Sequence, residues 1–173
     1  MLILSKLLNC VYEFCRLTNI LFFSMKQMTL TSSAFQDRGQ IPSKYTCDGE
    51  DINPPLEVQN VPEDAQSLAL IVEDPDSPGK TWVHWVVFNI SPHTTRIMED
   101  SVPIGASEVV TDFGSSGYGG PCPASGIHRY SFKLFALDDF LDLTEDVTRE
   151  EIEQAMSGHV IEKAELTGLY TRE

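Results

Sequence analysis

Two apolar stretches near the middle of the chain are separated by a short run of turn-forming residues. The first, residues 68–72, leads directly into "EDPDSPG". Asp, Ser and Gly favour turns, and proline has no N–H to give to a sheet, so we expect a buried strand that ends here. The second, residues 82–90, is aromatic and β-branched on both faces, which is typical of a strand inside a sheet. The pattern predicts an antiparallel hairpin around residues 74–81.

Three more stretches have the composition of strands: residues 108–114, 129–137 and 164–171. In the second of them apolar residues recur at every other position, and the side chains of a strand alternate between two faces. One face of this strand is therefore predicted to consist of Tyr130, Phe132, Leu134 and Ala136.

One helix is indicated near the C-terminus. Thr148 is followed three residues later by Glu151, which is the pattern of a capping box, and an apolar stripe comes next. Gly158 is suited to end the helix. No repeat or linker divides the chain after its first segment, so we expect one mainly β domain with one or two short C-terminal helices.

The overall charge excludes some classes of partner. The chain has 173 residues, of which 26 are acidic and 12 basic, for a formal net charge of -14. Phosphate backbones are bound mainly by Lys and Arg, so a general nucleic-acid binder is not indicated. The same charge argues against a surface that lies flat on an anionic membrane. A local pocket for one small anion remains compatible with it.

The first 27 residues differ from the rest. They are rich in Leu, Ile and Phe, but charged residues interrupt them before an uncharged run reaches the ~20 residues of a membrane span. They also lack a small-residue cleavage site of the signal-peptide type. The preferred interpretation is a translation start at Met25 or Met28, with an upstream extension before it. An uncleaved anchor and a weak export signal are the alternatives.

The cysteines give little sign of metal binding. Cys10 and Cys15 lie in the first segment, Cys47 and Cys122 lie in the domain, and no two form a CxxC pair. Structural zinc is therefore not indicated. Reduced thiols in a cytoplasmic protein are the simpler interpretation, and a Cys47–Cys122 disulfide is the alternative.

The turn and second strand of the predicted hairpin carry the first group of candidate site residues. In "DPDSPGKTWVHW", Asp74 and Asp76 follow one strand, and His84 lies three residues into the next, on the same face as Trp82. The pairing of the strands would bring these groups together. In isolation, however, the aspartates also suit a simple turn, and His84 suits a hydrogen-bonded core position.

"GYGGPCPASGIHRY", residues 117–130, carries the second group. Gly119 and Gly120 allow a backbone to approach a ligand closely, Pro123 stiffens the loop, and His128 and Tyr130 share a strand face. The pattern is neither a phosphate-binding P-loop nor a nucleophile elbow. Taken alone, it is equally typical of a glycine-rich connection between strands.

Three chemistries fit two histidines beside two aspartates: anion binding, metal binding and general-base hydrolysis. Metal binding lacks an H-x-H or H-E-x-x-H spacing. Hydrolysis lacks a placed nucleophile, because four residues are equal candidates: Ser115, Ser116, Cys122 and Ser125. Anion binding needs the fewest assumptions.

The two motifs, in this order, resemble the paired signatures of the phosphatidylethanolamine-binding protein family, in its bacterial Raf-kinase-inhibitor-like branch. "LTSSAFQDRGQIPSKYTCDGEDINPPLEV" and "SGHVIEKAELTGLYTR" are similar to that branch as well. The resemblance covers about residue 28 to the C-terminus and leaves residues 1–27 without a counterpart.

The resemblance implies a mainly β fold with a large central antiparallel sheet, a smaller packed sheet and short peripheral helices. It also implies a small surface cavity that binds anions such as phosphate, a small phosphorylated ligand or a phospholipid head group. We expect a non-catalytic binding protein without metal or cofactor. The alternatives are a hydrolase, in one form metal-assisted, that uses the same pocket, and a protein-interaction module with a vestigial pocket. Eukaryotic relatives regulate kinases or transcription complexes, so a kinase or other regulatory partner is one expectation, and a homodimer is compatible with it. The pocket residues it implies are Asp74, Asp76, Trp82, His84, Gly119, Gly120, Pro123, His128 and Tyr130.

Overall fold

Two β-sheets and one α-helix make up the domain. The structure, a computed structural model, describes residues 26–144 and 147–172, so nearly all of the distinct segment 1–27 lies outside the described residues. The large sheet has the strand order β2 (Gly39–Gln40), β9 (Val160–Tyr170), β8 (His128–Leu137), β4 (Ser67–Asp74), β5 (Trp82–Ile90) and β7 (Ser107–Glu108). The small sheet has the order β1 (Thr29–Thr31), β3 (Leu56–Gln59) and β6 (Arg96–Ile97). The mainly β architecture with a smaller packed sheet is thus confirmed.

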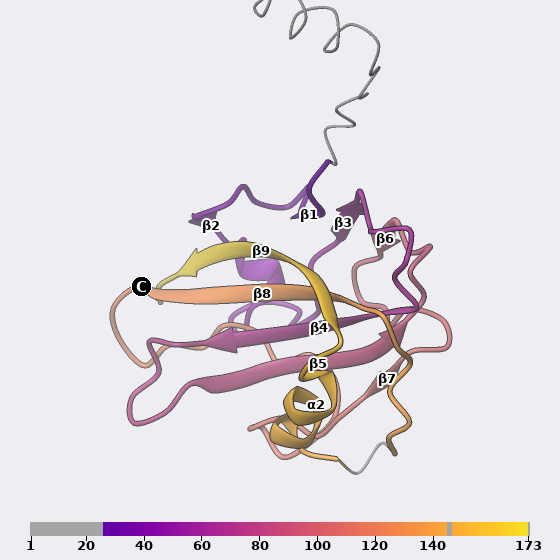
Figure 1. The fold of residues 1–173 in the computed structure, drawn as a ribbon. Helices are drawn as coiled ribbons and strands as arrows, with labels where there is room; N and C mark the ends of the chain where they lie inside the picture. The colour runs from indigo at the N-terminus through magenta and orange to yellow at the C-terminus, as the bar shows by residue number, and fades with distance from the viewer. Residues whose placement is uncertain (1–25, 145–146, 173) are drawn as a thin grey trace, which may run out of the picture.

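The predicted hairpin forms the centre of the large sheet (Figure 1). β4 and β5 are antiparallel, and β8 pairs antiparallel with the other edge of β4. Every residue of β4 is buried, as expected for a strand that is apolar on both faces. Because β4 ends where β5 and β8 begin, this end of the sheet brings both candidate motifs together.

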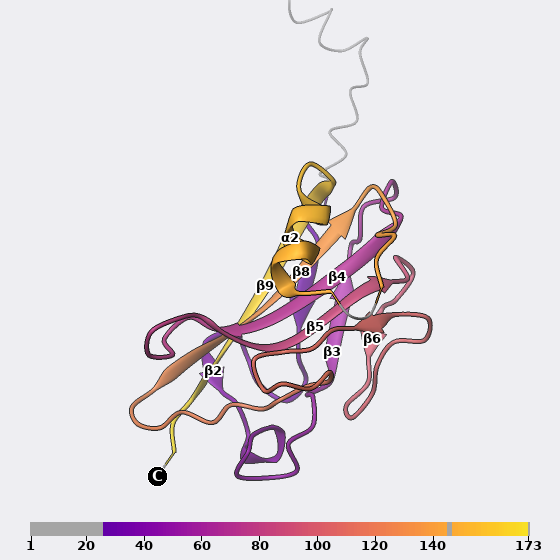
Figure 2. The ribbon, with the colours of Figure 1, turned by 90° about the horizontal axis from the view of Figure 1, so that it is seen from below.

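The large sheet is covered on both faces. On one face it packs against the small sheet, and Tyr130, Phe132, Leu134 and Ala136 all belong to this core, which confirms the predicted strand face. On the other face it packs against the helix α2 (Arg149–Met156). Figure 2 shows α2 on one side of the sheet and the segment that follows β2 on the opposite side.

The capping box and stop of the helix are confirmed. The side chain of Thr148 accepts a hydrogen bond from the backbone N–H of Glu151, and the Glu151 carboxylate accepts one from the Thr148 backbone. Ile152 and Met156 are buried against the sheet, and Gly158 has the positive φ of 90° that suits a residue after a helix. A short 3-10 helix, η1 (Ser43–Tyr45), lies between β2 and β3.

A β-bulge in β5 sets the direction of His84. Glu73 pairs with Val83 and Val72 pairs with Trp85, so His84 is an extra residue without a partner in β4. His84 and Trp85 can therefore both face the core between the sheets. The ring of His84 packs on Tyr130 of β8, at 5.1 Å between centroids, which places it on that face.

The strand predicted at residues 108–114 is wrong for most of its length. Only Glu108, with Ser107, belongs to β7. After Val109 the chain turns, with the Asp112 carboxylate accepting a hydrogen bond from the backbone N–H of Val83 at 2.7 Å. Gly114 then has a φ of 79°, which a strand does not tolerate. Asp112 thus holds the turn against β5 where the apolar pattern alone indicates a strand.

Cys47 and Cys122 form a disulfide with their Cα atoms 5.5 Å apart. The interpretation of this pair as reduced thiols is therefore wrong for this structure, because two segments 75 residues apart in the sequence meet here. Among the described residues, no helix has the length and apolar character to cross a membrane.

Candidate functional site

The two motifs meet where β4 ends and β8 begins. Nδ1 of His128 lies 2.6 Å from Oδ2 of Asp74, and the other carboxylate oxygen of Asp74 accepts the backbone N–H of Asp76 at 2.8 Å. A carboxylate accepts hydrogen bonds, so Nδ1 of His128 carries the proton. The Nε2 atom of His128 then remains for a ligand.

His84 is oriented by the backbone of the glycine-rich loop rather than by an aspartate. Its Nδ1 lies 2.6 Å from the carbonyl oxygen of Gly119, which can only accept, so Nδ1 donates. The backbone N–H of Gly119 donates in return to the carbonyl of His84 at 2.9 Å. Burial lowers the pKa of His84, against the opposing effects of the Gly119 carbonyl and nearby carboxylates. At neutral pH the ring is neutral, with its lone pair on Nε2.

Tyr130 supplies a third polar group on the same face. The residue exposes 1% of its surface, and its hydroxyl has no hydrogen-bond partner among the described residues. Burial, with the charge of Asp74, raises the pKa of this hydroxyl, and the nearby Cys122 backbone opposes this rise without reaching hydrogen-bond geometry. A buried hydroxyl without a partner costs free energy, so this atom is suited to bond a ligand.

Two aromatic rings form one wall, and one of them was not predicted. Phe113 packs edge-on against Trp82 and His84, with ring centroids 5.6 and 5.3 Å apart. The Lys80 ammonium lies 5.3 Å from the centre of the Trp82 ring. Phe113 lies in the stretch whose apolar pattern indicates a strand, so that pattern does not indicate that its ring packs against Trp82 and His84.

Asp76 contacts an arginine and not a histidine. Its carboxylate accepts hydrogen bonds from the backbone and from the guanidinium of Arg129, at 2.6 to 2.9 Å. The side-chain hydrogen bond from Arg129 is the main cause that lowers the pKa of Asp76 to about 2. Arg129 lies between His128 and Tyr130 in β8. Because side chains of a strand alternate between two faces, Arg129 lies on the face opposite to these two residues. The structure thus assigns Asp76 to the turn.

Gly120 contacts the segment after η1 and not the histidines. The backbone N–H of Gly120 donates to Asp51 at 2.7 Å, and a Cβ at Gly120 would lie 2.7 Å from Thr46 Cα. This position therefore needs glycine because two backbones approach closely. Pro123 is buried in the same loop. Asp51 is the second contributing residue that the motifs do not reveal.

The cluster is mostly covered from solvent. Asp74, His84 and Tyr130 expose 4, 3 and 1% of their surfaces. Surface hollows of about 660, 500 and 410 Å³ are lined by other residues and by none of the nine predicted ones. These hollows therefore lie away from the cluster of Asp74, His84 and Tyr130.

The candidate nucleophiles and metal ligands of the sequence can be compared with the contacts that the structure shows. Cys122 is bonded to Cys47 and is not a free thiol. In the described part of the chain, no serine hydroxyl is hydrogen-bonded to His84 or His128, and no group of three or more His, Cys, Asp or Glu side chains is arranged to hold a metal ion. Among the described residues, the Nε2 atoms of His84 and His128 and the hydroxyl of Tyr130 have no hydrogen-bond partner.

Comparison with protein families and sequences gives one consistent result. Residues 31–171 match the family model described as phosphatidylethanolamine-binding protein. A UPF0098 protein of Methanothermobacter thermautotrophicus is 52% identical over 150 residues, which cover 84% of this chain and 99% of the relative. A UPF0098 protein of Chlamydia muridarum is 44% identical over 151 residues, which cover 84% and 100%.

Solved structures agree. A phosphatidylethanolamine-binding protein homologue, CT736 of Chlamydia trachomatis, superposes with a TM-score of 0.82 and 43% identity, over 85% of this chain and 99% of that one. YbcL of E. coli, described as a member of the mammalian PEBP family, has a TM-score of 0.80 and 30% identity, over 86% and 100%.

Proposed function

Because the chain belongs to the phosphatidylethanolamine-binding protein family, we propose that the cluster of Asp74, His84, His128 and Tyr130 binds the phosphate group of a small phosphorylated molecule or of a phospholipid head group. The proposed role is binding without catalysis. A kinase or other signalling protein that responds to the occupied pocket is the corresponding proposal for a partner.

One observation carries this proposal. Both imidazoles use Nδ1 for a hydrogen bond to the protein, and the neighbouring Tyr130 hydroxyl has no hydrogen-bond partner among the described residues. Fixing Nδ1 fixes the ring and directs Nε2 away from its protein partner. Phosphate oxygens accept hydrogen bonds from hydroxyl and imidazolium groups, so these three atoms suit a phosphate in chemistry.

The charges nearby determine the protonation of the bound state. Asp74 pairs with His128, and Asp76 is already neutralised by Arg129. With both aspartates paired in this way, the cluster carries no excess positive charge to attract an anion unless a histidine is protonated. Since burial lowers the pKa of His84 and an anion favours the charged form of an adjacent histidine, we expect ligand binding to be coupled to proton uptake at His84.

A cytoplasmic location is part of the proposal, although its first basis, reduced cysteines, no longer holds. In a reducing compartment a surface disulfide is typically redox-responsive rather than permanent. Fractionation of the native organism, with the thiol state of Cys47 and Cys122 measured by alkylation, tests this location. Recovery of the protein only outside the cytoplasm would contradict it.

The binding proposal is tested by titrating the protein with inorganic phosphate and O-phosphoethanolamine while the imidazole signals are followed by NMR. We expect the Nε2 signals of His84 and His128 to shift together and to saturate, with His93 and His159 unaffected. If neither ligand moves the two signals, the pocket does not bind phosphate groups. A larger response to phosphoethanolamine would favour a head group over free phosphate.

A further inference from the structure

The Cys47–Cys122 disulfide joins two loops, one of which forms part of the candidate site. Cys122 belongs to residues 109–127, which connect β7 to β8, and Cys47 belongs to the loop after η1. Beyond the disulfide, the loops are held by contacts such as the hydrogen bond from the Cys47 N–H to the Pro121 carbonyl at 3.2 Å. The Tyr118 hydroxyl also donates to the Tyr45 carbonyl at 3.0 Å.

The glycine-rich loop, residues 109–127, contains little regular secondary structure that would fix its position. Within residues 109–127 the only sheet-like pairing described is the single bridge between Val110 and Ser116. Positive φ angles at Gly114, Gly117 and Gly126 break the extended conformation repeatedly. Ordering such a segment costs conformational entropy, so a covalent link to a second loop strongly affects where it lies.

The position of this loop determines the orientation of His84. Gly119, three residues before Cys122, accepts the Nδ1 proton of His84 at 2.6 Å and donates its own N–H to the His84 carbonyl. The backbone N–H of Cys122 itself lies beside the Tyr130 hydroxyl. Two of the three ligand-facing groups are therefore adjacent to the segment that the disulfide holds. The third, His128, is held by Asp74 instead.

The disulfide is accessible to a reductant. Cys122 is exposed and Cys47 is half-buried. A thiolate of a small dithiol can attack one of the two sulfurs and form a mixed disulfide, which the second thiolate of the dithiol resolves. The dithiol is oxidised to its cyclic disulfide, and its two electrons and two protons leave Cys47 and Cys122 as free thiols.

We propose that the Cys47–Cys122 disulfide positions the glycine-rich loop on His84, so that its reduction weakens anion binding at the pocket. This inference rests on the proposed function and adds a redox control to the same site. The disulfide acts as a positioning element, because it touches the ligand only through the loop it holds.

The test compares the affinity for inorganic phosphate of the oxidised full-length protein with that of the protein reduced by dithiothreitol, at a temperature where both are folded by circular dichroism. The loss of one well-placed hydrogen-bonding group predicts an affinity about threefold to tenfold lower after reduction. The double variant Cys47→Ser/Cys122→Ser should have the affinity of the reduced protein and should not respond to dithiothreitol.

A spectroscopic readout separates positioning from a general loss of stability. In the oxidised protein, the Nδ1 protons of His84 and His128 should both be visible by NMR, because both are hydrogen-bonded. Reduction should broaden or remove the signal of His84 and leave that of His128, which does not depend on the loop. Loss of both signals together would show unfolding of the site and would overturn the inference.

A variant that keeps the disulfide provides an independent test. A Cβ at Gly120 would lie 2.6 Å from Asp51 Oδ1 and 2.8 Å from the Tyr45 carbonyl oxygen, so Gly120→Ala should push the loop away from its partner. The oxidised variant should bind phosphate as weakly as the reduced protein, whereas the exposed Ser125→Ala should bind normally.

The outcomes distinguish this inference from the proposed function. Equal affinity of the oxidised, reduced and Gly120→Ala proteins, with binding still present, would overturn the redox control and leave phosphate binding intact. An oxidised wild-type protein that binds no phosphate at all would overturn both. If reduction unfolds the protein, the oxidised Gly120→Ala variant decides the question, and a normal affinity there would refute the positioning role.

Discussion

The carboxylate of Asp74 and the Nδ1 atom of His128 lie 2.6 Å apart although 54 residues separate them in the sequence. The antiparallel pairing of β4 and β8 brings them together, because the end of one strand lies beside the start of the other. The pair joins the two sequence motifs into one site and fixes which nitrogen of His128 faces a ligand.

Replacing Asp74 tests this pairing. In Asp74→Asn one of the two oxygens becomes an NH2 group, which cannot accept a hydrogen bond. The remaining oxygen cannot replace both acceptors, so the bond to the His128 Nδ1–H or the bond to the Asp76 N–H is lost. We expect phosphate affinity to fall about tenfold, since a charge-assisted hydrogen bond is lost. Calorimetric titration measures the change. Asp138→Asn is the matched control, because Asp138 pairs with the exposed His159 at the other end of β8.

The pH dependence of binding follows from the burial of His84. Its lowered pKa leaves the ring neutral in the free protein at pH 7, and an anion favours the protonated form. Affinity for sulfate, whose own charge is constant, should therefore rise as pH falls below the ordinary histidine value of ~6.5. Titrations between pH 5 and 8 measure this effect. A constant affinity over that range would contradict proton uptake by the site.

The ion pair between Asp76 and Arg129 should make the stability of the fold depend on pH in the acid range. Since the pKa of Asp76 is lowered to about 2, its stabilising effect is present above the ordinary carboxyl pKa and is lost as pH falls toward 2. Arg129→Ala should lower the melting temperature at pH 6, with a difference from wild type that shrinks toward pH 2. The comparably exposed Arg96→Ala should show a smaller difference throughout. Parallel curves would argue against the pairing.

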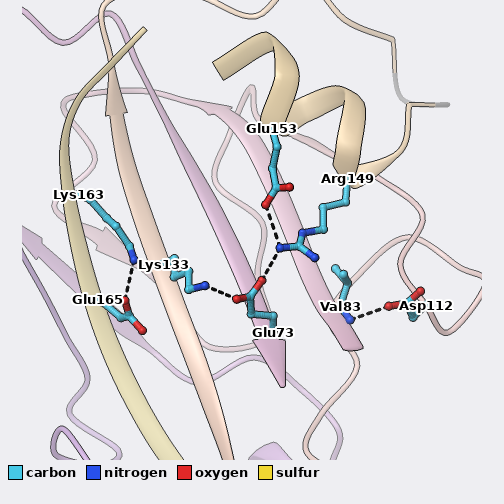
Figure 3. A network of polar contacts seen from close by, with 8 residues as sticks. All are labelled: Glu73, Val83, Asp112, Lys133, Arg149, Glu153, Lys163 and Glu165. Carbon is cyan, nitrogen blue, oxygen red and sulfur yellow. Dashed lines mark hydrogen bonds and ion pairs between the residues drawn. The ribbon is translucent and has the colours of Figure 1, made fainter. Parts of the chain in front are cut away.

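A buried network on the opposite face supports the fold and not the site. Figure 3 shows Glu73 between Lys133 of β8 and Arg149 of α2, with Arg149 also contacting Glu153. Glu73 exposes 4% of its surface, so Glu73→Ala leaves two largely covered cations without their common partner.

We expect Glu73→Ala to lower the free energy of unfolding by about 2–4 kcal/mol, measured by denaturant titration. Glu153→Ala should cost about 0.5 kcal/mol, as an exposed helix pair does. Phosphate affinity should be unchanged in both variants, because Glu73 and Asp74 point to opposite faces of β4. A loss of binding in folded Glu73→Ala would show that the two faces are coupled.

The central strands, the helix and the convergence of the two motifs were predictable from sequence because each depends on local pattern. Alternation in residues 129–137 indicated which side chains share a face, and Thr148 with Glu151 marked the helix start. The two motifs contain both histidines and Asp74. Because these residues lie at or near strand ends, the pairing of the strands brings them together.

What the sequence did not reveal depends on contacts between distant segments. The extra residue at His84 reflects the register of β5 on β4, and the turn at Asp112 reflects a hydrogen bond to Val83. The disulfide required knowledge of how the loop after η1 meets the glycine-rich loop. The partner of Asp76 was missed because Arg129 lies between two site residues and acts from the other face of the strand.

The central claim is that His84 and His128 bind a phosphate group together. Calorimetric titration of the oxidised protein and of His84→Ala, His128→Ala and His159→Ala with O-phosphoethanolamine tests it most directly. We predict that each of the first two variants folds normally and binds at least tenfold more weakly than wild type, and that His159→Ala binds as wild type does. Unchanged affinity in both His84→Ala and His128→Ala would contradict the claim.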